Sequence, residues 1–225
     1  MSLSGTAFTV IWHDLNPGFE AEFERWHTEE HMPERLGVPG FLRGRRYMNW
    51  QQSPHVCFTL YELAHTETFR SPGYLARLNA PTEWSNRVQP GMSNFLRGVC
   101  ETVVSLGDGT AGAVGTLRLR WAGGTSAAAD MALSNAALQA FQLAGVTSVH
   151  LGRHIAQWAN AATGETKLRP PPSTAEFDYV LLVEAIDQKT LAGARAQLEQ
   201  LLKSAGAGEV DGGHYTLGYQ LLAPR

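Results

Sequence analysis

Two histidines that lie four residues apart, His27 and His31, stand in the stretch HTEEHMPERLGVPG with two glutamates between them. Four residues make about one helical turn, so both imidazoles would lie on one face of a helix. Histidine accepts or donates a proton near neutral pH, which suits enolisation, dehydration or removal of a proton from an activated aromatic compound. His31 is therefore the first candidate acid/base residue and His27 the second.

Two other interpretations of these residues stay open. They could simply be the polar end of a helix, because Pro33 lacks an N–H and disrupts continuation, although a kinked continuation is also possible. They could also bind a metal, but a zinc site needs a third protein ligand, and the order differs from H-E-x-x-H. Glu30 could contribute, yet nothing in the sequence marks it. We expect no metal.

Aromatic and polar side chains elsewhere supply candidates for binding a ligand. They are Trp12, His13, Arg46, Tyr61 and Trp84. Most aromatic residues in strands belong to the core, and we expect Trp50 and Trp158 to be packing residues of this kind. His154 could in principle ligate a haem iron, but we expect no cofactor. The sequence has no G-x-G-x-x-G or P-loop pattern and no serine elbow.

The periodicity of apolar residues predicts the same series of elements twice. The first series has strands at 6–13, 41–50, 56–63 and 95–106, with helical regions at 18–31, 66–79 and 82–94. The second series has strands at 114–121, 148–158, 177–186 and 214–222, with helices at 126–143 and 188–204. Each series is β-α-β-β-α-β, so the chain divides into residues 1–108 and 109–225.

Residue identities support the duplication. GRRYMNW at 44–50 aligns with GRHIAQW at 152–158, which places Arg45 and Arg153 at equivalent positions. A residue that both halves share favours a structural role, such as pairing with a carboxylate of Glu62 or Glu184. The inserted loop 159–175 is polar and proline-rich, which favours an exposed arm over a flap that covers a pocket or a neighbouring subunit.

The strands carry apolar residues on both faces, as in FTVIW at 8–12 and VCFTLY at 56–61. The helices of one β-α-β-β-α-β unit cover only one face of its sheet, so the other face needs a second cover. We therefore predict an α+β fold in which two tandem ferredoxin-like repeats pack sheet to sheet as an intramolecular α+β barrel.

The step Glu30-His31-x-Pro33, followed by Val38-Pro39-Gly40 and an arginine-rich strand, resembles the EthD-like group within the dimeric α+β barrel superfamily. The resemblance covers the first helix and second strand well and the second half only as a diverged copy. That superfamily includes cofactor-free monooxygenases, isomerases, cyclases, dehydratases and haem enzymes. The resemblance therefore implies an architecture and a small-molecule pocket more than one reaction.

The composition of the chain argues against several other classes of function. The formal charge is −3, from 18 Lys+Arg against 21 Asp+Glu, and no basic block is present, so nucleic acid is not an expected partner. No run of about 18 apolar residues predicts a membrane span, and we expect a cytoplasmic protein. Cys57 and Cys100 are far apart and are expected to be buried free thiols. Either a monomer or a homodimer fits.

The leading functional hypothesis is a cofactor-independent enzyme that acts on a small aromatic, polyketide-like or lactone compound by histidine-assisted proton transfer. Two alternatives stay open. One is a protein that binds or senses a small hydrophobic or aromatic molecule without chemistry, and the other is a protein of this fold with no functional cavity.

Overall fold

The structure is a computed structural model that describes residues 3–156, 163–169 and 177–224. Its first half runs β1 (Ala7–Leu15), α1 (Glu20–Trp26), a π-helical segment (His27–His31), α2 (Met32–Leu36), β2 (Phe41–Met48), β3 (Cys57–Leu63), a 3-10 turn (Thr66–Arg70), α3 (Pro72–Asn79), α4 (Glu83–Val88), a 3-10 turn (Gln89–Gly91) and β4 (Met92–Leu106).

The second half runs β5 (Ala113–Leu119), α5 (Ala127–Phe141), β6 (Val146–His154), a 3-10 turn (Glu165–Lys167), β7 (Tyr179–Ala185), α6 (Gln188–Ala205), β8 (Val210–Asp211) and β9 (His214–Leu222). The main elements follow the expected order. Their ends differ by a few residues: the helical region expected at 82–94 ends at Gly91, and the strand expected to reach residue 158 ends at His154.

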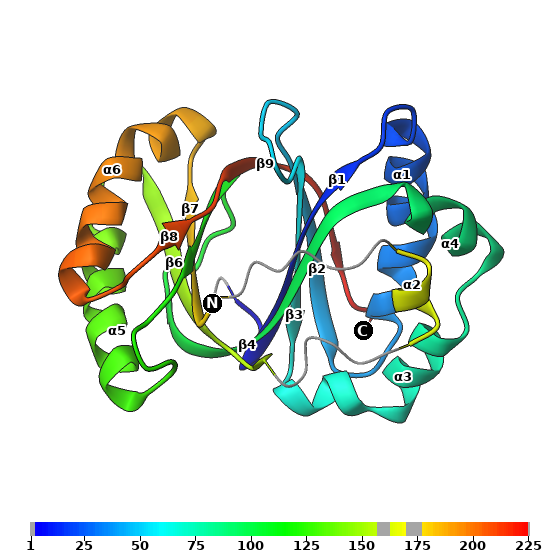
Figure 1. Cartoon of the computed structure of the whole chain (residues 1–225), viewed down its shortest axis with the longest axis horizontal. Coiled ribbons are helices and arrows are strands. Elements are labelled where there is room, and N and C mark those ends of the chain that lie inside the picture. Colours follow the sequence, from blue (N-terminus) through cyan, green and yellow to red (C-terminus); the bar gives the residue numbers. More distant parts are fainter. Residues whose placement is uncertain (1–2, 157–162, 170–176, 225) are drawn as a thin grey trace.

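The strands form one closed antiparallel barrel. They are hydrogen-bonded in the order β7-β6-β4-β1-β3-β2-β9-β5, and β5 pairs back with β7; the short β8 lies beside β5. The two halves are therefore joined edge to edge, through β4 with β6 and β2 with β9. Figure 1 shows α1 to α4 on one side of the barrel and α5 and α6 on the other. The fold is mixed α+β.

The first-half strands bury both faces, as their composition predicts. Every residue of β3 (CFTLYEL) is buried. Phe58 and Leu60 belong to the cluster that fills the barrel, together with Trp12 of β1. The alternate residues of β3, such as Tyr61, belong to a cluster formed with the covering helices. Because side chains alternate along a strand, one sequence serves two cores.

The first helix continues through Pro33 instead of ending there. The backbone N–H of Met32 donates to the carbonyl oxygen of His27, a bond between residues five apart, which is the π-helical pattern. This wider turn leaves carbonyl groups without the usual donor, and Pro33 has no N–H to offer them. The expected interruption is thus replaced by a π-helical segment that contains both candidate histidines.

The barrel interior carries a buried ion-pair network that joins the halves. Arg45 of β2 contacts Glu62 of β3 at 2.8 Å and Glu184 of β7 at 2.7 Å. This confirms the pairing predicted for Arg45. Arg153, by contrast, contacts Glu101 and Asp130, so its partners are different carboxylates from those expected.

Three further expectations concern single residues. Cys57 and Cys100 are both buried and free, as predicted. Trp50 is not a packing residue, because it follows the end of β2 in a turn and is 53% exposed. Trp158 lies outside the described residues.

No described helix is both long and apolar enough to cross a membrane.

Candidate active site

A pocket lies between the outer face of the first-half sheet and the helix that carries the two histidines. The sheet contributes Ile11, His13, Tyr61 and Arg97 to its wall, the helix contributes Trp26, His27, His31 and Arg35, and the second-half segment 163–169 contributes Glu165 and Arg169. The cavity within it has a volume of about 40 Å³. The pocket is therefore narrow.

The π-helical segment presents both histidines to this pocket. His27 is buried and His31 is half-buried, and their ring centroids are 5.6 Å apart. The His31 ring lies against Trp26, with centroids 4.3 Å apart. Its Nδ1 atom is buried and has no hydrogen-bond partner among the described residues. π-Helical turns often occur at functional sites, and here one orients a histidine with an unused ring nitrogen.

The pocket histidines are held in the neutral form. Burial lowers the pKa of His31 well below its ordinary value, and the neighbouring guanidinium of Arg35 lowers it further. Burial and Arg46 have the same effect on the pKa of His27. Burial lowers the pKa of His13 to about 4, although its hydrogen bond to the Asp14 carbonyl opposes the shift. All three rings are therefore unprotonated at neutral pH.

His27 has contacts on both ring nitrogens, in contrast to His31. Its Nδ1 lies 3.5 Å from Nη1 of Arg46, and its Nε2 lies 3.4 Å from the Tyr61 hydroxyl. Burial raises the pKa of Tyr61, so this hydroxyl stays protonated. These contacts orient His27 but engage the atoms through which it would exchange a proton. His31 is the better placed of the two as a base.

Segment 163–169 covers the pocket, so the exposed arm expected for this part of the loop is wrong and the alternative of a flap over a pocket is right. Glu165 is 2% exposed and pairs with Arg35, which is 3% exposed. Arg169 donates from Nε to Oε1 of Gln89 at 2.7 Å, and its guanidinium lies 4.2 Å from the ring centroid of Phe95. The remaining parts of the loop lie outside the described residues.

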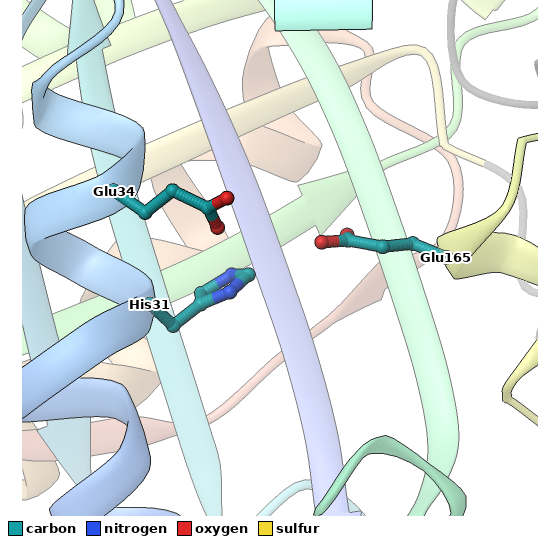
Figure 2. Close-up of side chains that lie close together, drawn as sticks. All are labelled: His31, Glu34 and Glu165. Atoms are coloured by element: carbon teal, nitrogen blue, oxygen red, sulfur yellow. The ribbon is translucent and has the colours of Figure 1, made fainter. Parts of the chain in front are cut away.

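His31, Glu34 and Glu165 could offer three ligand atoms to a metal, because these atoms lie within 4.8 Å of one another. Figure 2 shows His31 and Glu34 projecting from the helix toward Glu165, which enters from the opposite side. However, Arg35 contacts both carboxylates and Arg169 contacts Glu165. A cation would have to displace these guanidinium groups, so the charge distribution does not favour a metal here.

The structure brings only some of the predicted site residues together. His13, His27, His31 and Tyr61 line the pocket. Arg46 lies behind His27, where it also donates to the Thr28 hydroxyl at 3.0 Å. These five form one region of the molecule.

Trp12 and Trp84 lie elsewhere. Trp12 follows the alternation of β1 into the barrel, on the opposite face from His13, and its Nε1 donates to Thr116 Oγ1 at 3.2 Å. Trp84 lines a shallow surface depression and packs against Arg25, whose guanidinium carbon is 5.6 Å from its ring centroid. Their predicted roles in ligand binding gain no support from their positions.

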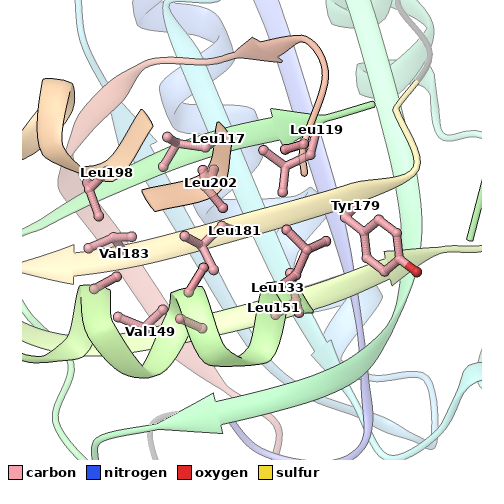
Figure 3. Packing of buried hydrophobic residues seen from close by; sticks show 14 of the residues in the cluster. Leu117, Leu119, Leu133, Val149, Leu151, Tyr179, Leu181, Val183, Leu198 and Leu202 are labelled. Atoms are coloured by element: carbon pink, nitrogen blue, oxygen red, sulfur yellow. The ribbon is translucent and has the colours of Figure 1, made fainter. Parts of the chain in front are cut away.

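The second half offers a different environment on its helix-covered face. Leucine, valine and alanine side chains from α5, α6 and the strands fill this space, including Leu117, Leu133, Leu151 and Leu181 (Figure 3).

His154, the candidate haem ligand, stacks on Phe177 with centroids 4.5 Å apart and contacts the Phe177 carbonyl oxygen through Nδ1 at 2.9 Å. That geometry points to packing, and the expected absence of a cofactor stays a prediction.

The chain resembles several solved structures over nearly its whole length. The chain resembles an anthrone oxidase-like protein with a TM-score of 0.63 and 12% identity, over 100% of this chain and 97% of that one. It resembles a candidate monooxygenase from Fusobacterium nucleatum with a TM-score of 0.56 and 11% identity, over 98% and 96% of the two chains. It resembles chlorite dismutase from Candidatus Nitrospira defluvii with a TM-score of 0.58 and 12% identity, over 96% and 92%.

The chain has the α+β barrel fold. The solved structures that it resembles are members of the dimeric α+β barrel group, and identities this low show the fold alone. No protein-family profile matches the chain. No curated protein matches its sequence.

Several residues of the site have no clear signal in the sequence. Arg35 and Gln89 look like ordinary polar residues of short helical segments, and Glu165 and Arg169 come from a loop without periodicity. The only usable signal was the loop itself, since long loops without regular structure often cover binding sites.

Proposed function

We propose that this protein is a cofactor-independent enzyme that removes a proton from an activated carbon of a small aromatic or polyketide-like compound, with His31 as the base. The proposal is supported by the neutral His31 ring, which lines the pocket and whose buried Nδ1 has no hydrogen-bond partner among the described residues. An unused, neutral imidazole nitrogen in a partly enclosed pocket is the group that such a reaction requires.

The cationic wall of the pocket suits the negative charge that proton removal creates. Loss of a proton beside a carbonyl group gives an enolate or phenolate. Arg35, Arg97 and Arg169 all line the pocket and provide guanidinium groups for an oxyanion. Burial and the neighbouring charge of Arg35 hold His31 neutral before the reaction.

The likeness to an anthrone oxidase-like protein and a candidate monooxygenase supports oxygen as a second substrate. The anthrone carbanion would add O2 at the same carbon, and the peroxide would take back the proton held by His31. The hydroperoxide would then lose its remaining C–H proton together with hydroxide, as water, which leaves the anthraquinone. The existence of the pocket argues against the alternative of a fold without a cavity. Binding without chemistry stays the competing function.

The finer assignments belong to the same proposal. We place the chain among the EthD-like proteins, on the Glu30-His31-x-Pro33 step, and in the cytoplasm. We also propose that residues 1–108 and 109–225 are tandem ferredoxin-like repeats. Support comes from the matching strand orders, β4-β1-β3-β2 in the first half and β9-β5-β7-β6 in the second.

The test is turnover of anthrone together with smaller aromatic and lactone compounds, followed by oxygen uptake and by product absorbance. We expect turnover by the wild-type protein and a loss of about 10²-fold or more in His31→Ala. His65→Ala is the matched control, since His65 is exposed and is not among the residues that line the pocket. Ligand binding without turnover, unchanged in His31→Ala, would favour the binding function and overturn the proposal.

A further inference from the structure

We infer that Arg35, Arg169 and Gln89 form a carboxylate-binding subsite, and that the chain's own Glu165 side chain occupies it in this structure. The substrate would then be an aromatic or polyketide-like acid. This inference deepens the proposed function and rests on the pocket being the substrate site.

One buried carboxylate is held by two guanidinium groups that come from distant parts of the chain. Nη2 of Arg35 donates to Oε1 of Glu165, and Nη2 of Arg169 donates to Oε2 at 3.0 Å. Glu165 and Arg35 are separated by 130 residues in the sequence, and both are at most 3% exposed. This is the arrangement in which proteins bind a ligand carboxylate.

Two polar atoms at the same pocket lack partners among the described residues. Gln89 is 1% exposed, and its Oε1 accepts the hydrogen bond from Arg169. Its Nε2, a donor, is buried and unpartnered, as is Nδ1 of His31. Buried polar groups normally have hydrogen-bond partners. An acceptor that enters beside Arg169 would satisfy Gln89, and it would bring a substrate close to His31.

The charges of the pocket wall favour an anion over a cation. Arg35, Arg97 and Arg169 line the pocket, whereas Glu165 is the one acidic residue in the described lining. Burial lowers the pKa of Arg169 to about 10, and the nearby charge of Arg97 contributes to this shift, so Arg169 remains charged at neutral pH. A substrate carboxylate would replace the charge of Glu165 without altering the net charge of the pocket.

The size of the pocket explains why Glu165 has to be displaced. The cavity volume is about 40 Å³, which suits a few water molecules but not an aromatic ring. Rotation of the Glu165 side chain away from the pocket would add space and free Nη2 of Arg35 and Nη2 of Arg169, while Nη1 of Arg35 would keep Glu34. The Glu165 carboxylate uses the guanidinium nitrogens that a substrate carboxylate would use, so it competes with an acidic substrate for them.

The test compares 2-naphthoate with its neutral analogue 2-naphthamide, with binding followed by calorimetry. In Glu165→Gln the internal carboxylate is gone but the side-chain shape is kept. We expect the ratio of naphthoate to naphthamide affinity to rise about tenfold relative to wild type. Glu199→Gln, which removes a carboxylate paired with Arg195 on α6, is the matched control and should leave the ratio unchanged.

Two further variants identify the subsite. Adding Arg169→Gln to Glu165→Gln should abolish the gain. Gln89→Leu alone should weaken naphthoate binding about fivefold and leave naphthamide binding unchanged, a readout that holds even if Glu165→Gln does not fold. An unchanged ratio in Glu165→Gln, or naphthoate binding unaffected in Gln89→Leu, would overturn the inference.

Failure here can be told apart from failure of the proposed function. Turnover that depends on His31 but shows no preference for acids would remove the subsite and keep the enzyme. A preference for acids that increases in Glu165→Gln, without turnover of any compound, would keep the subsite and remove the enzyme.

Discussion

Replacing Arg45 with methionine tests the ion pairs that join the two halves inside the barrel. Arg45 is fully buried and lies between Glu62 of the first half and Glu184 of the second. The substitution keeps much of the side-chain length but leaves two buried carboxylates without this shared cation. Removing one partner of a buried ion pair usually costs about 3–5 kcal/mol.

The remaining contacts place the expected cost at the lower end of that range. Glu62 keeps Arg43, with contacts of 2.7 and 2.8 Å, and Glu184 keeps the N–H of Ala111 at 3.0 Å and His150. We therefore expect the free energy of unfolding to fall by about 3 kcal/mol at pH 7. The equivalent substitution Arg153→Met should cost about 0.5–1 kcal/mol, because Arg153 and Glu101 are 32% and 49% exposed.

The effect should also depend on pH. Burial alone would raise the pKa of Glu184, but its contacts with His150 and Arg45 lower it to about 2 from the ordinary 4.5. The stability that comes from this ionisation is thus present above pH 4.5 and is lost as the pH falls toward 2. The difference between wild type and Arg45→Met should shrink on acidification.

Equilibrium urea unfolding of the wild type, Arg45→Met and Arg153→Met, at pH 7 and pH 3, measures both effects. Equal losses in the two variants at pH 7 would refute the assignment of Arg45 as the buried link between the halves. A pH-independent difference would refute the role given to Glu184.

Two other predictions concern β1, whose neighbouring residues face opposite sides. Unfolded His13 binds a proton near pH 6.5, and folded His13 does so only near pH 4, so its contribution to stability is present above pH 6.5 and is lost as the pH falls to 4, about 3 kcal/mol in total. Urea unfolding of His13→Phe should lack this pH dependence. An unchanged dependence of the unfolding free energy on pH would count against a neutral His13. Trp12→Phe should lower the free energy of unfolding by about 1–3 kcal/mol, because the hydrogen bond to Thr116 is lost. The affinity for 2-naphthoate should stay unchanged, since Trp12 faces the barrel interior. A large loss of this affinity would place Trp12 in the binding site.

The β1 strand also shows how far sequence reasoning reaches. Its apolar residues on both faces predicted a strand buried on both sides, and the structure confirms this. The same alternation means that Trp12 and His13 cannot line one pocket, so the rule that predicted the strand could have removed Trp12 from the site.

The histidine spacing was informative, whereas the backbone around it was not. His27 and His31 lie together because their spacing matches a helical turn, and they reach the pocket as a pair. The π-helical segment could not be foreseen from Met32-Pro33, since a proline is compatible with an end, a kink or a wider turn.

Segment 163–169, which covers the pocket, shows which contacts cannot be predicted from a single sequence. Glu165 and Arg169 meet Arg35 and Gln89 through contacts between residues 80 to 130 positions apart. Local periodicity carries no information about such contacts, and polar loops look alike whether they cover a site or face solvent.

His31 can act as a base only if its ring is neutral within the pocket at physiological pH. Nitrogen-detected NMR of the histidine side chains, with the His31 signal assigned through His31→Ala, follows its protonation directly. We predict a titration midpoint for His31 well below that of an ordinary exposed histidine, because burial and Arg35 lower its pKa. A midpoint near 6.5, the value of an ordinary exposed histidine, would show that His31 is not a buried, neutral ring.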